Sequence, residues 1–487
     1  MKCFKSKFLS LCFVLLGFII FAEPTAVKGL YSYKLNNGLS LFVAENHSVP
    51  LSYIEIAVRC GAYTQTEETN GLFHLYEHMM FKGNSLYKDA ASVTKALSDL
   101  GVAEWNGTTD IECVNYYFTI PSDMTEKGLE FWNAAIRTPK MDETELENEK
   151  KVVLSEIKAN FSNLDRIYLN SKNKLLFSEA PYKLTTSGSE QVVQNATVKQ
   201  LKEIQKRFYI PNNAAVFVGG DIEPDKVYAM VKKIFGSWKK GPDPFENKES
   251  NPDRLVEFTK NPFSKPVYAV MANDKISKDI AQIEVSYRGP DCYFDRDDTY
   301  SADILGDLMR VPKGYFKQYM CQDPLLFIPD TNYVGASYYT RKINGIYSFV
   351  AVVQNPNNSV AERAIYFADI IPKVVKAEAR NASEKAINTV VGRLNDMDLW
   401  NQQTAFGILS ALRFWWTVSD EDYYFTYNTK MSEVIPEDLL DFVERYFENK
   451  APLVTVCLNP EVYESCKEDF KKNGFIVLND EEGDYNE

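Results

Sequence analysis

Histidine, positive charge and long hydrophobic runs are all scarce in this sequence. Only three of its 487 residues are histidine, and 54 basic residues stand against 67 acidic ones, a formal net charge of −13. A nucleic-acid-binding protein needs basic surface, so this balance argues against that class. Beyond the N-terminus, no apolar stretch approaches the ~20 residues that a membrane-spanning helix requires.

The N-terminus is the exception, because the apolar run Phe8–Phe21 follows Lys2, Lys5 and Lys7. A basic head, an apolar middle and a small residue at the exit, here Ala22, are typical of a secretory signal. The run is shorter than a spanning helix, although an uncleaved anchor is the alternative. We therefore expect a periplasmic or secreted protein with no stable membrane span once the signal is removed.

The eight cysteines form no metal-binding pattern. Two fall in the signal, and the others are scattered without a C-x-x-C pair: Cys60, Cys113, Cys292, Cys321, Cys457 and Cys466. An exported protein can form disulfides, yet a chain of this length does not depend on them. We expect these cysteines to be small buried hydrophobic residues rather than metal ligands.

The rest of the composition is that of a globular protein with both helices and strands. Apolar residues make up 45% of the chain and charged residues 25%. Runs rich in β-branched and aromatic residues predict strands at 39–44, 52–59, 115–120, 214–218, 283–287, 346–353 and 453–458. Helical patterns cover 90–100, 143–176 and 198–208, the last with a capping box from Thr197 to Gln200.

The chemistry concentrates in the segment GLFHLYEHMMFKG, residues 71–83. On a helix, positions i and i+4 share a face, so His74 and His78 can offer two imidazole nitrogens to one metal ion. Glu77 projects from the same side and can sit beside a metal-bound water. The spacing is the H-x-x-E-H of zinc peptidases, whose metal commonly takes three protein ligands and keeps one open position.

A third ligand can come from the acidic stretch at residues 142–157. Glu149 and Glu156 are seven residues apart and would lie on one face of a helix, two turns from each other. One of them can coordinate the metal while the other orients the ligands. By themselves, two glutamates at this spacing are ordinary on the solvated face of a polar helix.

Together these motifs resemble the pitrilysin/insulinase family of zinc metallopeptidases, which includes the mitochondrial processing peptidases. The family pattern G-x-x-H-x-x-E-H-x-x-F-K-G is followed further along the chain by E-R-x-x-V-x-x-E, and this chain has EKKVVLSE. The resemblance implies one Zn²⁺ per chain, bound by His74, His78 and Glu156. It also implies that Glu77 is the general base and that Glu149 is an essential carboxylate beside the ligands.

The resemblance implies the fold and a substrate contact as well. The expected fold class is α+β, with two related domains that each hold a mainly antiparallel sheet flanked by helices. Asn106 and Gly107 lie in a segment, NGTT, that resembles the family's N-A-x-T strand, which holds the substrate as an added β-strand. We divide the chain into a signal peptide (1–22), an N-terminal zinc-binding peptidase domain (23–240), a polar linker (241–262) and a C-terminal peptidase-like domain without a metal site (263–487).

One departure from the family concerns partners. Active members carry an R-x-x-x-G-L-A-Y type segment in this second domain or in a partner's, and its arginine and tyrosine help to hold the substrate and the oxyanion. The matching positions here are Met320 and Phe327, which cannot donate those hydrogen bonds. We expect a heterodimer with a related subunit that supplies the Arg/Tyr pair; a weakly active homodimer is the alternative.

The sequence thus predicts a zinc metalloendopeptidase that hydrolyses peptides or unfolded polypeptides, with Glu77 activating a zinc-bound water. The alternative is a catalytically weak or inactive zinc-bearing subunit that acts in assembly or peptide binding. The intact H-x-x-E-H favours the enzyme over that alternative.

Overall fold

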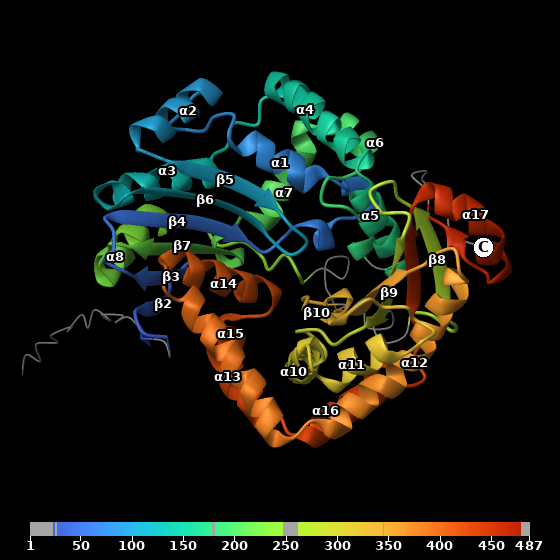
Figure 1. Cartoon of the computed structure of the whole chain (residues 1–487). Helices are drawn as coiled ribbons and strands as arrows, with labels where there is room; N and C mark the ends of the chain where they lie inside the picture. The colour runs from blue at the N-terminus through green and yellow to red at the C-terminus, as the bar shows by residue number, and fades with distance from the viewer. Residues whose placement is uncertain (1–22, 25–26, 178–180, 247–261, 344, 479–487) are drawn as a thin grey trace, which may run out of the picture.

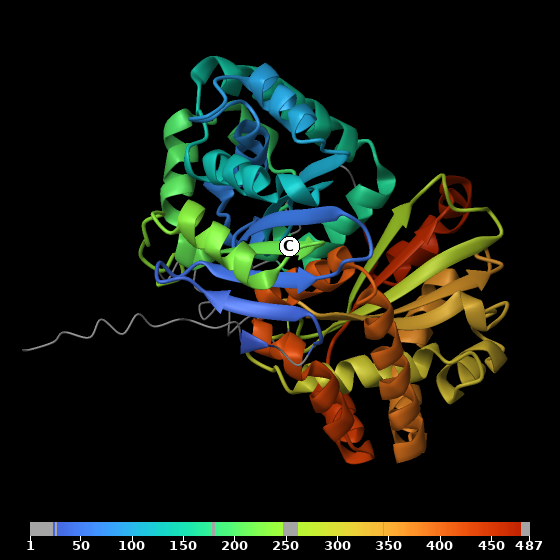
Figure 2. The ribbon, with the colours of Figure 1, turned by 90° about the vertical axis from the view of Figure 1, so that its left-hand side faces the viewer.

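The computed structural model describes residues 23–24, 27–177, 181–246, 262–343 and 345–478. These residues form two sheets, one from each half of the chain, with helices packed around them (Figure 1 and Figure 2). The expected signal peptide at 1–22 lies outside the described residues. So does most of the expected linker, residues 247–261.

The N-terminal half forms a sheet with the strand order β1-β2-β3-β7-β4-β6-β5. Its strands are β1 (Glu23–Pro24), β2 (Leu30–Lys34), β3 (Ser40–Glu45), β4 (Leu51–Val58), β5 (Glu104–Thr109), β6 (Val114–Pro121) and β7 (Ala214–Gly220). The pair β3 and β7 is parallel, and the other pairs of this sheet are antiparallel. In the described sheet β5 forms an edge and pairs only with β6.

The C-terminal half repeats this plan in the order β10-β11-β9-β12-β8-β13. Its strands are β8 (Val267–Ala272), β9 (Ile280–Arg288), β10 (Val334–Tyr339), β11 (Ile346–Gln354), β12 (Leu453–Leu458) and β13 (Ile476–Val477). In each half the last long strand is parallel to an early strand and antiparallel to the next: β7 with β3 and β4, β12 with β8 and β9. The expected α+β fold of two related, mainly antiparallel domains is confirmed.

Helices surround both sheets. The N-terminal half contributes α1 (Leu72–Met80), α2 (Ala90–Asp99), α3 (Thr125–Arg137), α4 (Glu143–Phe161), α5 (Leu164–Leu176), α6 (Glu190–Gln194), α7 (Val198–Phe208) and α8 (Pro224–Phe235). The C-terminal half contributes α10 (Asp298–Arg310), α11 (Tyr315–Gln322), α12 (Val360–Asn381), α13 (Glu384–Asn401), α14 (Ala405–Val418), α15 (Glu421–Glu433), α16 (Pro436–Tyr446) and α17 (Pro460–Lys472).

Two helix predictions have different outcomes. The capping box expected at the start of the 198–208 helix is confirmed, because Thr197 and Gln200 each bond the other's backbone amide. The single helix expected over 143–176 is instead two helices, α4 and α5. Asn163 starts the second one, since its side chain accepts a hydrogen bond from the amide of Asp165.

The alternation of side chains along β4 explains why the first sheet is covered on both faces. Ile54, Ile56 and Val58 point into the core that contains residues of α1 and α3. Tyr53 and Ala57 point the other way, into an apolar cluster with residues of α14. Because successive side chains of a strand alternate, a strand buried on both faces needs apolar residues at nearly every position.

Helix α14 belongs to the C-terminal half, yet it packs on the N-terminal sheet. A Cβ added at Gly219 would lie 2.7 Å from Leu409 Cδ1 and 2.8 Å from Ala405 Cβ, so this approach requires glycine. The guanidinium of Arg59 lies 4.0 Å from the ring centroid of Trp416 and donates to its carbonyl oxygen. The packing therefore crosses the domain boundary expected near residues 241–262.

Two further expectations concern membranes and cysteines. No helix in the described part of the chain combines the length and apolarity needed to cross a membrane. All six described cysteines are free, and every one except Cys321 is buried. Five of the six are thus small buried side chains, as expected, whereas Cys321 is partly exposed.

Candidate active site

Helix α1 presents the H-x-x-E-H side chains along one side. Its other side is fixed in the core by Leu72, Phe73, Leu75, Tyr76, Met79 and Met80, all buried. The helix begins after Gly71, which has a φ of 99°. A Cβ at Gly71 would lie 2.7 Å from the Cα of Gly188, so both the backbone angle and the space require glycine.

Three side chains from α1 and α4 converge as a candidate metal site. One ligand atom each of His74, His78 and Glu156 lies within 4.8 Å of the others. Nε2 of His74 and Nε2 of His78 are 3.5 Å and 3.6 Å from Oε2 of Glu156. Two imidazole nitrogens and one carboxylate oxygen are a donor set that suits zinc with an open fourth position. The described chain contains no second group of this kind.

The electrostatics of the cluster also fit a cation. Burial, followed by the neighbouring His78, lowers the pKa of His74 to about 4, so its imidazole is neutral and can bind a metal. Burial would lower the pKa of His78 too. The hydrogen bond with Glu149 and the negative charges of Glu156 and Glu77 outweigh burial and raise that pKa. Three carboxylates thus act on His78, and Glu156 lies beside both imidazoles.

Glu149 lies behind His78 and fixes its orientation. Its Oε2 is 3.2 Å from His78 Nδ1, and its Oε1 is 2.7 Å from Lys82 Nζ. Burial alone would raise the pKa of Glu149, but its bonds with His78 and Lys82 outweigh burial and lower the pKa. With Nδ1 held by this carboxylate, His78 has Nε2 left for the metal side.

Glu77 lies between the cluster and the edge strand β5. Its Oε2 accepts a hydrogen bond of 2.7 Å from the hydroxyl of Thr109. A Cβ added at Gly107 would be 3.1 Å from both Cγ and Oε1 of Glu77, so the glycine leaves room for the carboxylate. Burial raises the pKa of Glu77, against the opposing effects of Thr109 and His78. A carboxylate in such surroundings is suited to accept and release a proton.

The structure places Asn106 differently from Gly107. Along β5, Gly107 and Thr109 face Glu77, whereas Asn106 and Thr108 point to the other face of the sheet. The side chain of Asn106 is exposed, and its Oδ1 accepts from the amide of Gly107. Its side chain therefore does not lie against the carboxylate, and its contact with a substrate stays a prediction.

Sequence reasoning assigned no role to Thr109 or Lys82, although both touch the site. Their spacing from predicted site residues could have indicated that they lie near the site. Thr109 is two residues beyond Gly107, so it must share that residue's face of a strand. Lys82 is four residues beyond His78, close to the face that a helix would present to Glu149.

The positions of the missing Arg/Tyr pair lie away from this cluster. Met320 on α11 is completely buried in the core of the C-terminal half. Phe327, a few residues later, is 40% exposed and has the guanidinium of Arg363 at 5.0 Å from its ring centroid. Figure 1 shows α11 on the opposite side of the molecule from α1 and α4. The Met320 position therefore cannot serve this chain's own cluster.

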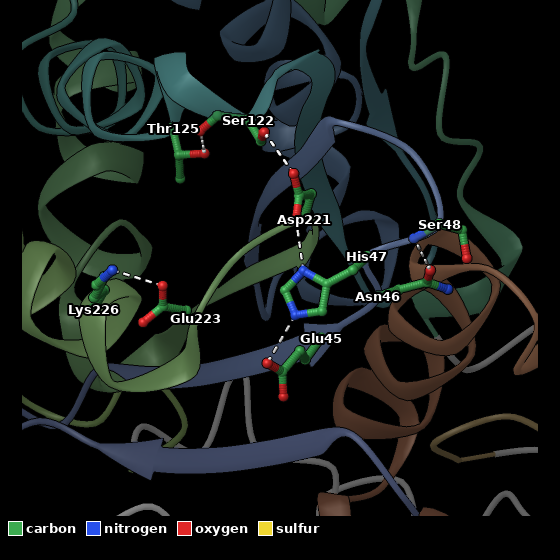
Figure 3. Close-up of polar contacts among 9 residues, drawn as sticks. All are labelled: Glu45, Asn46, His47, Ser48, Ser122, Thr125, Asp221, Glu223 and Lys226. Carbon is green, nitrogen blue, oxygen red and sulfur yellow. Dashed lines mark hydrogen bonds and ion pairs between the residues drawn. The ribbon is translucent and has the colours of Figure 1, made fainter.

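The third histidine takes no part in the cluster. His47, on the turn between β3 and β4, lies between two carboxylates: Nδ1 is 2.6 Å from Asp221 Oδ1, and Nε2 is 3.0 Å from Glu45 Oε1 (Figure 3). Ser122 donates to the other oxygen of Asp221. These contacts join the β3–β4 turn to the end of β7.

Two family models match most of this chain. The insulinase family, peptidase family M16, matches residues 41–190, which include α1, β5 and α4. The domain described as the peptidase M16 inactive domain matches residues 195–391.

Relatives of known sequence share part of their length with this chain. The zinc protease PqqE of Helicobacter pylori is 28% identical over 251 residues, which are 49% of this chain and 54% of that protein. A probable mitochondrial-processing peptidase subunit beta of Arabidopsis thaliana is 24% identical over 228 residues, 45% of this chain and 43% of that protein. The chain thus spans about half the length of the relatives that it matches.

Solved structures share the fold over nearly the whole described chain. The periplasmic protease PqqL from Escherichia coli aligns with a TM-score of 0.72 and 15% identity, covering 93% of this chain and 51% of PqqL. A protease from Helicobacter pylori aligns with a TM-score of 0.67 and 18% identity, covering 88% of this chain and 98% of that chain. With the two matched family domains, these likenesses lead to one conclusion: the chain belongs to peptidase family M16.

Proposed function

We propose that this protein is a zinc metalloendopeptidase that cleaves peptides or unfolded polypeptides. The observation that carries the proposal is the convergence of His74, His78 and Glu156, with Glu77 beside them. These three ligands would hold one Zn²⁺ per chain. When bound there, the ion would polarise the scissile carbonyl and acidify a water molecule.

The surrounding residues have separate tasks in this proposal. Glu77 accepts the proton of the attacking water and passes it to the leaving amine. The hydroxyl of Thr109 holds one oxygen of Glu77 at 2.7 Å and thereby fixes the direction of the other. Glu149 orients His78 through Nδ1, and the ammonium group of Lys82 favours the ionised form of Glu149.

The edge strand β5 supports the proposed substrate class. In the described sheet it pairs with β6 on one side, so its other side can accept an extended peptide as an added strand. Gly107 brings the backbone of β5 against Glu77. We therefore propose Asn106 and Gly107 as substrate-contacting residues. Because main-chain contacts dominate, cleavage should tolerate many sequences.

The relatives support a proposal about assembly and location. One of them is described as a subunit of a processing peptidase, and PqqL is about twice the length that this chain covers. We propose a dimer in which a related subunit supplies the Arg/Tyr pair, with a homodimer as the alternative. The expected N-terminal signal and the periplasmic description of PqqL favour the periplasm or the outside of the cell.

A peptidase assay on reduced casein tests the proposal. We expect 1,10-phenanthroline to abolish cleavage, and Zn²⁺ to restore it with about one zinc per chain by metal analysis. The assay is repeated on the complex recovered by native pull-down, so that a missing partner cannot hide the activity. Zinc binding without turnover in both preparations would contradict the proposal and favour a zinc-bearing assembly subunit.

A further inference from the structure

A row of polar side chains crosses the face of the first sheet that is turned away from the metal cluster. Its members, in order, are Arg413 of α14, Glu55 of β4, Asn115 of β6 and Thr108 of β5. We propose that this row positions the edge strand β5 and, through it, the carboxylate of Glu77. The inference rests on the proposed peptidase function and adds positioning residues to it.

Each contact in the row joins neighbouring elements. Arg413 Nε is 2.8 Å from Glu55 Oε1, and Asn115 Nδ2 donates to the same oxygen at 2.7 Å. Tyr53 donates to Glu55 Oε2 at 2.9 Å. The hydroxyl of Thr108 donates to Asn115 Oδ1. Glu55 is 0% exposed and Asn115 3%, and a buried carboxylate without such partners would be costly.

Strand β5 needs an anchor of this kind. It lies at the edge of the described sheet with β6 as its partner, and Gly107 at its centre adds backbone freedom. Thr108 and Thr109 are adjacent, so the contact of Thr108 on one face fixes the backbone that carries Thr109 on the other. Thr109 in turn holds Glu77. The row does not contact the carboxylate of Glu77. It therefore acts on this carboxylate indirectly, by fixing strand β5.

The Arg413 end of the row comes from an unexpected part of the chain. Arg413 lies on α14, beyond residue 391, where the match to the family domains ends. Helix α14 is seated against the sheet at Gly219, as described above. A helix of the C-terminal half thus contacts the polar row of the N-terminal sheet through the ion pair of Arg413 with Glu55.

The test uses the full-length chain, with its partner where the assay requires one. Thr108→Val should lower kcat about tenfold, because it removes the hydrogen bond that joins β5 to Asn115, and Thr108→Ser should restore kcat to within about twofold. Arg413→Met should lower kcat similarly. Combining it with Thr108→Val should add little, because both act through one row. Zinc content should not change, and Thr119→Val, in β6 but outside the row, should be neutral.

Amide hydrogen exchange gives a readout that is independent of turnover. Both variants should speed exchange about tenfold in β5 and leave β7 unchanged. If Arg413→Met fails to fold, the paired variant Glu55→Gln/Arg413→Met replaces it, since it leaves no buried charge unpaired.

Normal kcat and normal β5 exchange in Thr108→Val would overturn the inference. Equal acceleration in β5 and β7 would also overturn it, because that pattern indicates general destabilisation. If the wild-type protein shows no turnover at all, the proposed function fails, and exchange in β5 alone decides whether the row anchors the strand.

Discussion

The two halves of the molecule share one sheet plan but differ in the helix that follows the second core strand. In the N-terminal half α1 follows β4, and in the C-terminal half α10 follows β9. Helix α1 keeps His74, Glu77 and His78 on a partly exposed side, next to α4. The fold thus provides a scaffold in both halves, whereas the chemistry depends on a few side chains in one.

Helix α10 is the counterpart of α1 in the C-terminal half, and its side chains serve the core instead of a metal site. Ile304, Leu305 and Met309 are buried in the core of that half. One of its three acidic residues, Asp307, is buried too, and it pairs with Arg310 and Arg393. A carboxylate engaged by two guanidinium groups has no free oxygen to offer a metal. The described residues of this half also contain no group of three possible ligands, so we expect a single metal site in the described chain.

The largest effect should come from Glu77→Gln. This change keeps the shape of the side chain but removes the proton acceptor, so kcat should fall by roughly 10²–10⁴ while zinc stays bound. Steady-state kinetics on a quenched peptide, with metal analysis of the same sample, measures both. Glu147→Gln, an exposed carboxylate on α4, is the matched control. Undiminished activity in Glu77→Gln would show that another group activates the water.

A smaller loss of activity, but the largest loss of metal, should follow Glu156→Gln. Its Oε2 lies 3.5 Å from Nε2 of His74 and 3.6 Å from Nε2 of His78. We expect the zinc affinity to fall by more than the ~10–100-fold that is usual for residues next to the ligands. Competition titration with a zinc chelator measures this. An unchanged affinity would remove Glu156 from the ligand set.

Glu149→Gln should have an intermediate effect on zinc affinity and on activity. It retains a hydrogen-bond acceptor for His78 but loses the charge that pairs with Lys82. We expect a loss of roughly 10–100-fold in zinc affinity or activity. Lys82→Met should also lower zinc affinity and activity, but by less than Glu149→Gln does. If Glu149→Gln binds zinc and turns over like the wild type, the carboxylate only supports packing.

The smallest effect should come from the second half, from Phe327→Tyr. The side chain is partly exposed and belongs to the half that lacks the cluster. We expect kcat to stay within about twofold, and the free energy of unfolding to change by less than ~0.5 kcal/mol. A tenfold rise in kcat of the chain alone would show that the missing hydroxyl acts within the same chain, against the proposed heterodimer.

Much of this organisation could be predicted from the sequence, because it rests on local periodicity. The i, i+4 spacing of His74 and His78 and the i, i+7 spacing of Glu149 and Glu156 each fix a helix face. Every strand expected from the apolar runs is present, with ends shifted by a few residues. The end of α4 was missed because Asn163 interrupts a pattern that stays helical on both sides.

The rest could not be predicted because it depends on pairs that are distant in the chain. Glu55 and Arg413 meet only after α14 has packed on the first sheet. Thr109 reaches Glu77 only after β5 has joined β6 at the edge. No periodicity in a single sequence records such contacts, since they follow from the way sheets and helices assemble.

X-ray absorption at the zinc edge of the purified, full-length protein tests the central claim most directly. With His74, His78 and Glu156 as ligands, the spectrum should show nitrogen and oxygen neighbours at ~2.0–2.2 Å, including two imidazoles. Glu77→Gln should retain this spectrum. The absence of stoichiometric zinc, or a sulfur neighbour at ~2.3 Å from one of the free cysteines, would contradict it.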